Sequence, residues 1–246
     1  MTKTRLGIIG TGAFGAFMVR HLAPYADLVL YDAHKNTARM AKKYRATAGS
    51  LREAAACKIV VIAVPVQQIG KVLRRIAPLV KPGTLVCDVG SVKMKTAKLM
   101  REILPNDVDA VGTHPLFGPQ SGGSGIKGLN IVVCNVRGKR APCVRRFCRD
   151  KLGLSVFAAT PRAHDRELAY VQGLTHLLAK VVVALDLPRF RFTTKTYDYM
   201  EQMVEMVRYD SDELFRAIER ENPFTKKAKK EFFAAARNLE QKLLRG

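Results

Sequence analysis

The N-terminal segment constrains the fold most strongly, because a short apolar run meets a glycine-rich turn and then a helical pattern. Residues 5–10 (RLGIIG) are typical of a buried strand, and residues 13–22 carry apolar side chains at helical spacing. In a strand–turn–helix unit of this kind, glycines permit the tight turn, the approach of a pyrophosphate to the backbone, and close packing of helix on strand. The helix N-terminus adds free N–H groups and the positive end of a dipole. The turn therefore predicts a dinucleotide site formed by Gly10, Gly12, Ala13, Phe14 and Gly15.

An acidic residue at the end of the next apolar run indicates which dinucleotide binds. The apolar run of residues 28–31 is followed by Asp32, which lies 22 positions after Gly10. A carboxylate at this point can accept hydrogen bonds from the adenosine ribose hydroxyls, and it repels the 2′-phosphate of NADP. We therefore expect NAD as the cofactor, although His34 and Lys35, two and three residues after Asp32, leave NADP open.

Strand-like and helical runs alternate along the chain up to about residue 159. The strand-like runs are residues 5–10, 28–31, 58–64, 84–89, 110–112 and 130–134. Such alternation predicts an α/β domain of the Rossmann type with a doubly wound parallel sheet. Ligands of these sheets bind at the carboxyl ends of the strands, so Val64 and Pro65 at the end of the third run are expected to contact the cofactor.

After about residue 160 the pattern changes to helices alone. An apolar stripe follows residues 161–185, and further helices are predicted at residues 194–208, 211–221 and 223–244. The sequence therefore predicts two domains, with residues 1–159 binding the dinucleotide and residues 160–246 forming an all-α domain. Because a long apolar helix needs a partner surface, we expect a homodimer formed through the second domain.

Composition excludes several classes of protein. The formal net charge is +21, but the basic residues are spread along the chain and lack the interleaved aromatic side chains of a stacking platform, so nucleic acid is not an expected partner. The five cysteines form no CxxC pair, so no metal site is predicted. No apolar run is long enough to span a bilayer and no secretory signal opens the chain, so we expect a cytoplasmic protein without a membrane partner.

Four longer motifs occur in order along the chain. They are DVGSVK at residues 88–93, THPLFGPQSG at residues 113–122, HD at residues 164–165 and QGLTH at residues 172–176. With these motifs the chain resembles the prephenate/arogenate dehydrogenase family over essentially its whole length, and it is most similar to the compact arogenate dehydrogenases of the plant type. The resemblance implies an NAD(P)-dependent oxidative decarboxylation of arogenate, prephenate or both on the route to tyrosine.

The resemblance assigns the reaction to His114 and Ser91. A neutral imidazole can accept the proton of the substrate hydroxyl near neutral pH, and Ser91 is expected beside His114 and the nicotinamide. Ser91 also precedes a predicted helix, where serine is a common N-cap, and the two roles are compatible. Gln120 and Ser121 are expected to shape the mouth of the pocket, unless they only form a polar loop.

The resemblance also places substrate contacts on the long helix of the second domain. His176 is expected to hydrogen-bond the substrate, with Thr175 and Gln172 facing the same cavity. The HD pair at residues 164–165 is expected to be structural. A second histidine that many family members carry is replaced here by Ala179, so any role of that histidine is absent.

Asp210 bears on the choice of substrate. In the plant-type enzymes that the chain resembles, an acidic residue at the matching position goes with arogenate. The resemblance therefore implies that Asp210 attracts the side-chain ammonium of arogenate and repels the keto acid prephenate, unless Asp210 only caps the helix that begins near Ser211. The resemblance also implies an arginine of the second domain that grips the ring carboxylate, and no motif assigns it to a position in this chain. The candidates are Arg189, Arg191 and Lys195, and Thr194 is a further expected substrate contact in that segment.

Two alternatives come from other classes of protein. One is a different two-domain Rossmann oxidoreductase, of the β-hydroxyacid dehydrogenase or imine reductase type, but such enzymes lack the THPLFGPQSG segment. The other is a non-catalytic basic relative that binds nucleic acid. The intact glycine turn, Ser91 and His114 argue against a scaffold that has lost its chemistry.

Overall fold

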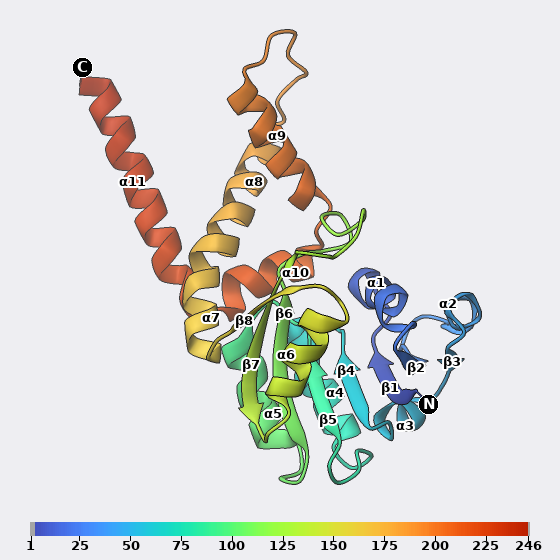
Figure 1. The fold of residues 1–246 in the computed structure, drawn as a ribbon. Helices are drawn as coiled ribbons and strands as arrows, with labels where there is room; N and C mark the ends of the chain where they lie inside the picture. The colour runs from blue at the N-terminus through green and yellow to red at the C-terminus, as the bar shows by residue number, and fades with distance from the viewer. Residues whose placement is uncertain (1–2, 246) are drawn as a thin grey trace. The chain divides into compact units, whose positions relative to one another are not determined.

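The computed structural model describes residues 3–245, and the chain divides into two compact units, Met1–Arg162 and Ala163–Gly246. The first unit contains the sheet and its covering helices, and the second unit contains helices (Figure 1). The change from alternating strands and helices to helices alone therefore coincides with a change of folding unit.

The sheet of the first unit has eight strands in the order β3-β2-β1-β4-β5-β6-β7-β8. The strands are β1 Thr4–Ile9, β2 Ala26–Tyr31, β3 Thr47–Ala48, β4 Ile59–Ile62, β5 Leu85–Asp88, β6 Asp109–Pro115, β7 Asn130–Arg137 and β8 Ser155–Ala158. The chain runs outward from β1 to β3, then returns to the other side of β1 with β4. This doubly wound order confirms the predicted fold class. It also creates a switch point between β1 and β4, where such sheets bind ligands.

The predicted all-parallel sheet is wrong at one pair of strands. β6 and β7 are antiparallel, whereas the pairs from β3 to β6 and the pair β7–β8 are parallel. The connection between β6 and β7 contains no helix among residues 116–129. A parallel return normally needs a crossover helix, so without one the chain returns beside β6 in the opposite direction.

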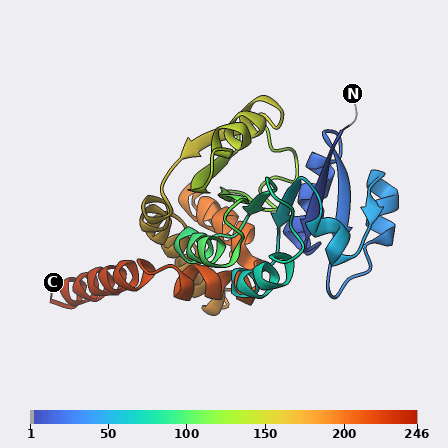
Figure 2. The same ribbon diagram turned by 90° about the horizontal axis from the view of Figure 1, so that it is seen from below.

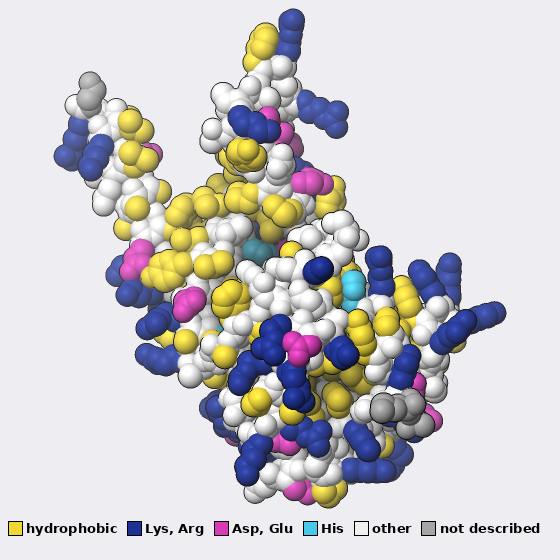
Figure 3. All heavy atoms as spheres, in the orientation of Figure 1, with side chains coloured by type: hydrophobic (Ala, Val, Ile, Leu, Met, Phe, Trp, Pro, Cys, Tyr) yellow, Lys and Arg dark blue, Asp and Glu magenta, His cyan; other side chains and the backbone are white. Residues whose placement is uncertain are grey.

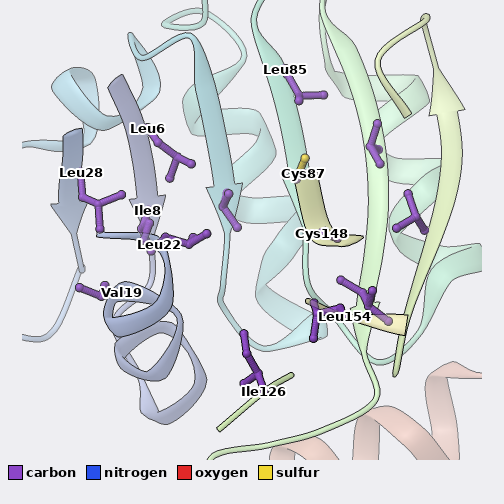
Figure 4. Close-up of a cluster of buried hydrophobic side chains, with 14 of the residues drawn as sticks. Leu6, Ile8, Val19, Leu22, Leu28, Leu85, Cys87, Ile126, Cys148 and Leu154 are labelled. Carbon is purple, nitrogen blue, oxygen red and sulfur yellow. The ribbon is translucent and has the colours of Figure 1, made fainter. Parts of the chain in front are cut away.

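Helices cover both faces of the sheet. They are α1 Ala13–Leu22, α2 Ala38–Tyr44, α3 Leu51–Ala55, α4 Val66–Ile76, α5 Lys93–Ile103 and α6 Ala141–Asp150. Figure 2 shows α6 on one side of the sheet and α4 and α5 on the other. Successive strand residues face opposite layers. Leu6 and Ile8 join the core under α1 (Figure 4). Ile9 joins the core under α4. Because both faces are buried, these strands appear in the sequence as continuous apolar runs.

Four elements of the first unit were not predicted. The strands β3 and β8 lie at the two edges of the sheet and are short, and most of their residues are exposed. The helix α3 has five residues, and α6 carries four arginine or aspartate side chains among its ten residues. Short or charged elements of this kind bury too few apolar side chains to produce a clear periodic pattern.

The second unit is built from one interrupted helix and a set of helices that follow it. The elements are α7 Pro161–Leu168, η1 Ala169–Leu174, α8 Thr175–Ala184, α9 Lys195–Arg208, α10 Asp212–Arg216, η2 Ala217–Glu221 and α11 Thr225–Arg245. The single helix predicted for residues 161–185 is continuous but contains the π-helical segment η1. Segments with π-helical hydrogen bonding occur frequently at functional sites.

Side-chain caps fix two helix starts in the second unit. Thr194 Oγ1 accepts a hydrogen bond from the Tyr197 N–H at 3.2 Å, and Ser211 Oγ accepts one from the Leu214 N–H at 3.2 Å. Each hydroxyl satisfies a backbone donor that the helix leaves open. Ser211, and not Asp210, therefore caps α10. None of the helices within residues 3–245 combines the length and apolar character required to cross a membrane.

Candidate functional site

The glycine turn between β1 and α1 has the backbone geometry that the sequence predicts. Gly10 has a φ of +101°, and a Cβ atom at Gly15 would lie 2.1 Å from the Gly10 carbonyl oxygen, so neither position admits a larger residue without distortion. A Cβ atom at Gly12 would meet no heavy atom within 4 Å. Gly12 is also the N-cap of α1 and provides no side-chain cap. The turn therefore presents open space and uncapped N–H groups, which fit a dinucleotide pyrophosphate.

The residues around the turn come from the strand ends at the switch point. Ala13 and Phe14 form the first turn of α1, and Phe14 packs on Phe17 with ring centroids 6.0 Å apart. Val64 and Pro65 follow β4, and Pro65 is the N-cap of α4. A Cβ atom at Gly10 would lie 2.8 Å from Val64 Cγ1, so the segment after β4 packs directly on the turn. The predicted cofactor residues are thus adjacent to one another.

Asp32 is held at the end of β2 by hydrogen bonds from the chain. Its Oδ2 accepts from the Thr11 N–H at 2.7 Å and the Thr11 hydroxyl at 3.1 Å, and its Oδ1 accepts from the N–H groups of His34 at 2.9 Å and Lys35 at 3.1 Å. Partial burial raises the pKa of Asp32, but these hydrogen bonds outweigh it and leave the pKa below its ordinary value. Asp32 therefore stays ionised and links the glycine turn to the loop after β2, a contact that the sequence did not reveal.

A buried ion pair lies beside His114 in the middle of the sheet. Lys93 and Asp88 form this pair, and both side chains are fully buried. Lys93 Nζ also donates to the Thr113 carbonyl at 2.7 Å, and the Thr113 hydroxyl donates to the Asp88 carbonyl at 2.7 Å. Lys93 begins the helix α5, where a lysine is normally exposed, but its side chain is shielded from solvent.

The ion pair fixes the backbone from which His114 projects. His114 follows Thr113 near the end of β6, pairs in register with Val132 of β7, and is 4% exposed. Gly112 leaves the room that the pair requires, since a Cβ atom there would lie 3.2 Å from Lys93 Cδ and 3.3 Å from Asp88 Oδ1. Burial raises the pKa of Asp88, while the Lys93 ammonium and the Gly90 N–H act in the opposite direction.

Ser91 and the loop after β6 complete the polar groups on this side of the first unit. Ser91 is 6% exposed, and its hydroxyl makes no hydrogen bond among the described residues, including to His114. It does not cap α5, whose N-cap is Val92. In the loop, Ser121 Oγ accepts from the Gly118 N–H at 3.0 Å, and both Ser121 and Gln120 are exposed. A buried hydroxyl without a protein partner is available to a ligand.

An apolar hollow of about 450 Å³ lies on the α1 face of the same sheet. Phe17 of α1, Phe147 of α6, and Val61 and Cys87 of the sheet contribute to its walls, and it extends to Thr113 and Pro115, the neighbours of His114. The backbone around His114 is therefore bordered by apolar side chains.

In the second unit, His176 and Asp210 approach each other. His176 is near the start of α8, Asp210 lies in the turn before α10, and His176 Nε2 is 3.8 Å from Asp210 Oδ2. Burial, with a smaller contribution from the Lys180 ammonium, lowers the pKa of His176 to about 4. Burial also raises the pKa of Asp210, and Lys180 opposes that shift. His176 is therefore neutral at pH 7 and able to donate or accept a hydrogen bond.

Several predicted substrate residues do not join His176. The Thr175 hydroxyl donates to the Val171 carbonyl at 2.6 Å, within its own helix. Thr194 and Lys195 are exposed at the start of α9, where Thr194 is the N-cap and Lys195 lies 5.0 Å from the centroid of the Tyr199 ring. Gln172 is half-buried in η1, one turn before His176.

The cationic candidates Arg189 and Arg191 lie in the exposed segment between α8 and α9, and the Arg191 guanidinium stacks 5.1 Å from the Phe192 ring centroid. The structure therefore does not group the candidates for the ring carboxylate with the His176–Asp210 pair.

The HD motif at residues 164–165 is part of the core of the second unit. His164 Nδ1 and Asp165 Oδ1 are 2.7 Å apart and both side chains are fully buried. Asn222 donates through Nδ2 to the Asp165 carbonyl at 2.7 Å, which ties α7 to the segment before α11. This placement agrees with a structural role. No group of three or more metal-ligating side chains occurs in the described part of the chain.

The switch-point turn, the ionised Asp32 and the doubly wound sheet define a nucleotide-binding Rossmann domain. Residues 16–128 match the family model described as prephenate dehydrogenase, nucleotide-binding domain. The chain belongs to the prephenate/arogenate dehydrogenase family.

Two curated relatives illustrate the similarity. The chain is 27% identical to arogenate dehydrogenase 1, chloroplastic, of Arabidopsis thaliana over 255 residues, which cover 98% of this chain and 39% of the relative. It is 31% identical to cyclohexadienyl dehydrogenase of Zymomonas mobilis, covering 73% of this chain and 66% of the relative.

A solved structure has the same fold. It is prephenate dehydrogenase from A. aeolicus in complex with hydroxyphenyl propionate and NAD+, with a TM-score of 0.79, 18% identity, and coverage of 100% of this chain and 92% of that chain. The chain spans about two fifths of the length of the first curated relatives that it matches, at 39% and 43%.

Proposed function

We propose that this chain catalyses the oxidative decarboxylation of arogenate, prephenate or both, with NAD as the preferred cofactor. The observation that carries the proposal is His114, a buried histidine at the carboxyl edge of the sheet whose backbone is fixed by the Lys93–Asp88 pair. The names of the relatives, arogenate dehydrogenase and cyclohexadienyl dehydrogenase, support the same substrate class.

His114 accepts the proton of the 4-hydroxyl group of the cyclohexadienyl substrate in this proposal. When bound at the glycine turn, the nicotinamide supplies the hydride acceptor for the same carbon atom. Loss of hydride and of the ring carboxylate as CO₂ leaves an aromatic ring, and the proton held by His114 returns to the phenolate oxygen. The substrate anion thus becomes a phenol, CO₂ and a transferred hydride, so atoms and charge balance. General base catalysis by a positioned histidine contributes about 100-fold to 10,000-fold to such a step.

Other residues of each unit bind and orient the reactants in this proposal. The N–H groups at the start of α1 hold the pyrophosphate, and Asp32 accepts hydrogen bonds from the ribose hydroxyls. The free hydroxyl of Ser91 is available to hydrogen-bond the reacting groups. His176, neutral and buried, donates a hydrogen bond to the substrate, and Asp210 favours a substrate that carries an ammonium group.

Initial rates with arogenate and prephenate, each with NAD and NADP, test the proposal. Formation of reduced cofactor is followed by its absorbance, and CO₂ release is measured in parallel. We expect turnover with at least one substrate, a preference for NAD, and one CO₂ for each reduced cofactor. Cofactor reduction without CO₂, or no turnover of either substrate, would contradict the proposed reaction.

An apolar face on the second unit supports a homodimer. Leu178 and Val181 of α8 and its C-cap Leu185 are spaced three and four residues apart and are 37%, 43% and 60% exposed. Side chains at this spacing share one helix face, which is costly to leave in water. Light scattering during size-exclusion chromatography should give twice the chain mass of 27.3 kDa, and Val181→Glu should reduce it to one chain. A monomeric wild-type chain at all concentrations would refute the dimer.

A further inference from the structure

Lys180 is an isolated cation within the apolar helix that carries His176. It lies one turn after His176 on α8, so the two side chains share a helix face. Its side chain is 30% exposed, and its Nζ lies 5.7 Å from the centroid of the Phe215 ring and 3.9 Å from Asp212 Oδ1. Because the Asp212 side chain is 77% exposed, this ion pair is a weak surface contact that leaves the ammonium available.

The charges around His176 are separated instead of neutralised. Lys180 acts electrostatically on both His176 and Asp210. Lys180 and Asp210 nevertheless form no ion pair with each other, and Asp210 approaches the neutral His176 instead. A carboxylate and an ammonium therefore lie near the same imidazole without pairing with each other. Such a pattern complements a ligand with the opposite pair of charges.

We propose that Lys180 binds the side-chain carboxylate of the substrate, while Asp210 binds the ammonium group on the same side chain. The proposal rests on the proposed function and extends it. It assigns the ammonium and the carboxylate on the side chain of the substrate ring to named residues of the second unit. His176, which both charges influence or approach, hydrogen-bonds the same substrate.

The other cations considered from the sequence lie elsewhere in the second unit. Lys195 is the first residue of α9 and Arg208 the last, which separates Lys195 from the Asp210 turn by about 20 Å at the α-helical rise of about 1.5 Å per residue. Lys195 and Arg191 each lie over a neighbouring aromatic ring. Lys180, unlike these candidates, acts electrostatically on both His176 and Asp210.

The two charges have different consequences for substrate choice. Arogenate and prephenate both carry a side-chain carboxylate, so Lys180 strengthens the binding of both. Only arogenate carries the ammonium group, so Asp210 separates the amino acid from the keto acid. Lys180 therefore sets affinity and Asp210 sets selectivity.

Three phenols separate these contacts by equilibrium binding. L-Tyrosine carries both groups, tyramine carries only the ammonium, and 3-(4-hydroxyphenyl)propionate carries only the carboxylate. Their dissociation constants are measured by isothermal titration calorimetry on the full chain saturated with NAD⁺. The variants are Lys180→Met and Lys180→Arg, with Lys226→Met, an exposed lysine of α11, as the matched control.

Lys180→Met should weaken L-tyrosine and the propionate at least about tenfold, as expected for a lost hydrogen bond between charged groups, and should leave tyramine unchanged. Lys180→Arg should restore most of the affinity, and Lys226→Met should change nothing. Equal weakening of all three ligands would show a structural role and overturn the proposal, as would no change in any of them.

The rates of the wild-type chain distinguish a wrong assignment of Lys180 from a wrong proposed function. If the chain turns over arogenate or prephenate but Lys180→Met leaves carboxylate binding unchanged, the assignment of Lys180 is wrong and the proposed function stands. If the wild-type chain neither turns over these substrates nor binds the phenols, the proposed function is wrong and the assignment of Lys180 falls with it.

Discussion

Removing the cation of the buried Lys93–Asp88 pair should destabilise the first unit strongly. In Lys93→Met the Asp88 carboxylate stays fully buried and keeps the Gly90 N–H, at 3.0 Å from its Oδ2, as a hydrogen-bond donor. The Thr113 carbonyl loses the Lys93 ammonium, which donates to it at 2.7 Å. The methionine fills a similar volume, so the expected loss comes from charge and hydrogen bonding more than from a cavity.

The magnitude follows from the burial of both partners. Breaking a buried ion pair by removing one partner costs about 3–5 kcal/mol, because the remaining charge has no compensation. For a chain of this size each kcal/mol lowers the melting temperature by about 2–4 °C, so a decrease of about 6–20 °C is expected. Replacing both partners removes the uncompensated charge, so Lys93→Met with Asp88→Asn should recover at least half of the loss.

Urea unfolding followed by far-ultraviolet circular dichroism measures the change, and hydrogen exchange of peptides from β5 and β6 assigns it to the first unit. The matched control is Lys98→Met on the same helix, since Lys98 forms an exposed pair with Glu102 at 3.8 Å and should change stability by less than about 1 kcal/mol. A loss for Lys93→Met no larger than that of the control would refute the reasoning. So would a double variant as unstable as the sum of the two single variants.

Three further predictions concern catalysis, acid stability and the turn. His114→Ala should lower kcat at least about 100-fold with NAD binding retained, measured by initial rates and calorimetry, and an unchanged kcat would exclude His114 as the base. The pKa of His176 is about 4 in the folded chain and about 6.5 when unfolded, so the unfolded state binds more protons between these values and stability falls as the pH drops from about 6.5 to about 4, by about 3 kcal/mol at most. Asp210, with its raised pKa, offsets part of this loss. Hydrogen exchange of α8 should show the pH dependence in the wild type and a smaller one in His176→Gln, and equal slopes would contradict it. Gly12→Ala should keep the melting temperature but weaken NAD binding about tenfold or more, whereas Gly15→Ala should lower the melting temperature, because only the Gly15 Cβ meets protein atoms. Equal melting temperatures would count against this distinction.

Much of the first unit was predictable because its central strands are buried on both faces and therefore form continuous apolar runs. The conformation of Gly10 and the close packing at Gly15 follow from spacing alone. The direction of β7 was not predictable in the same way, because an apolar run carries no information on strand polarity. It was set by the absence of a helix between residues 116 and 129.

The polar contacts of the site were less predictable. Lys93 begins a helix, where lysine is normally exposed, and only the spatial position of Asp88 at the end of β5 explains its burial. The π-helical segment before His176 leaves no mark in the apolar pattern. Lys180 did leave a signal, since a single lysine interrupts an apolar run of the same helix. Its spacing of four residues from His176 indicates that the two side chains share a helix face.

The hydrogen bonds of Asp32 have a consequence for the evolution of cofactor preference. In a dinucleotide site of this type the acidic residue hydrogen-bonds the ribose of the ligand. Here its removal would leave the N–H group of the buried Thr11 without an acceptor and release the loop at His34 and Lys35. A change from NAD to NADP in this chain therefore requires a residue at position 32 that still accepts hydrogen bonds, or compensating changes in the turn. Cofactor preference and the stability of the glycine turn are therefore coupled, because both depend on Asp32.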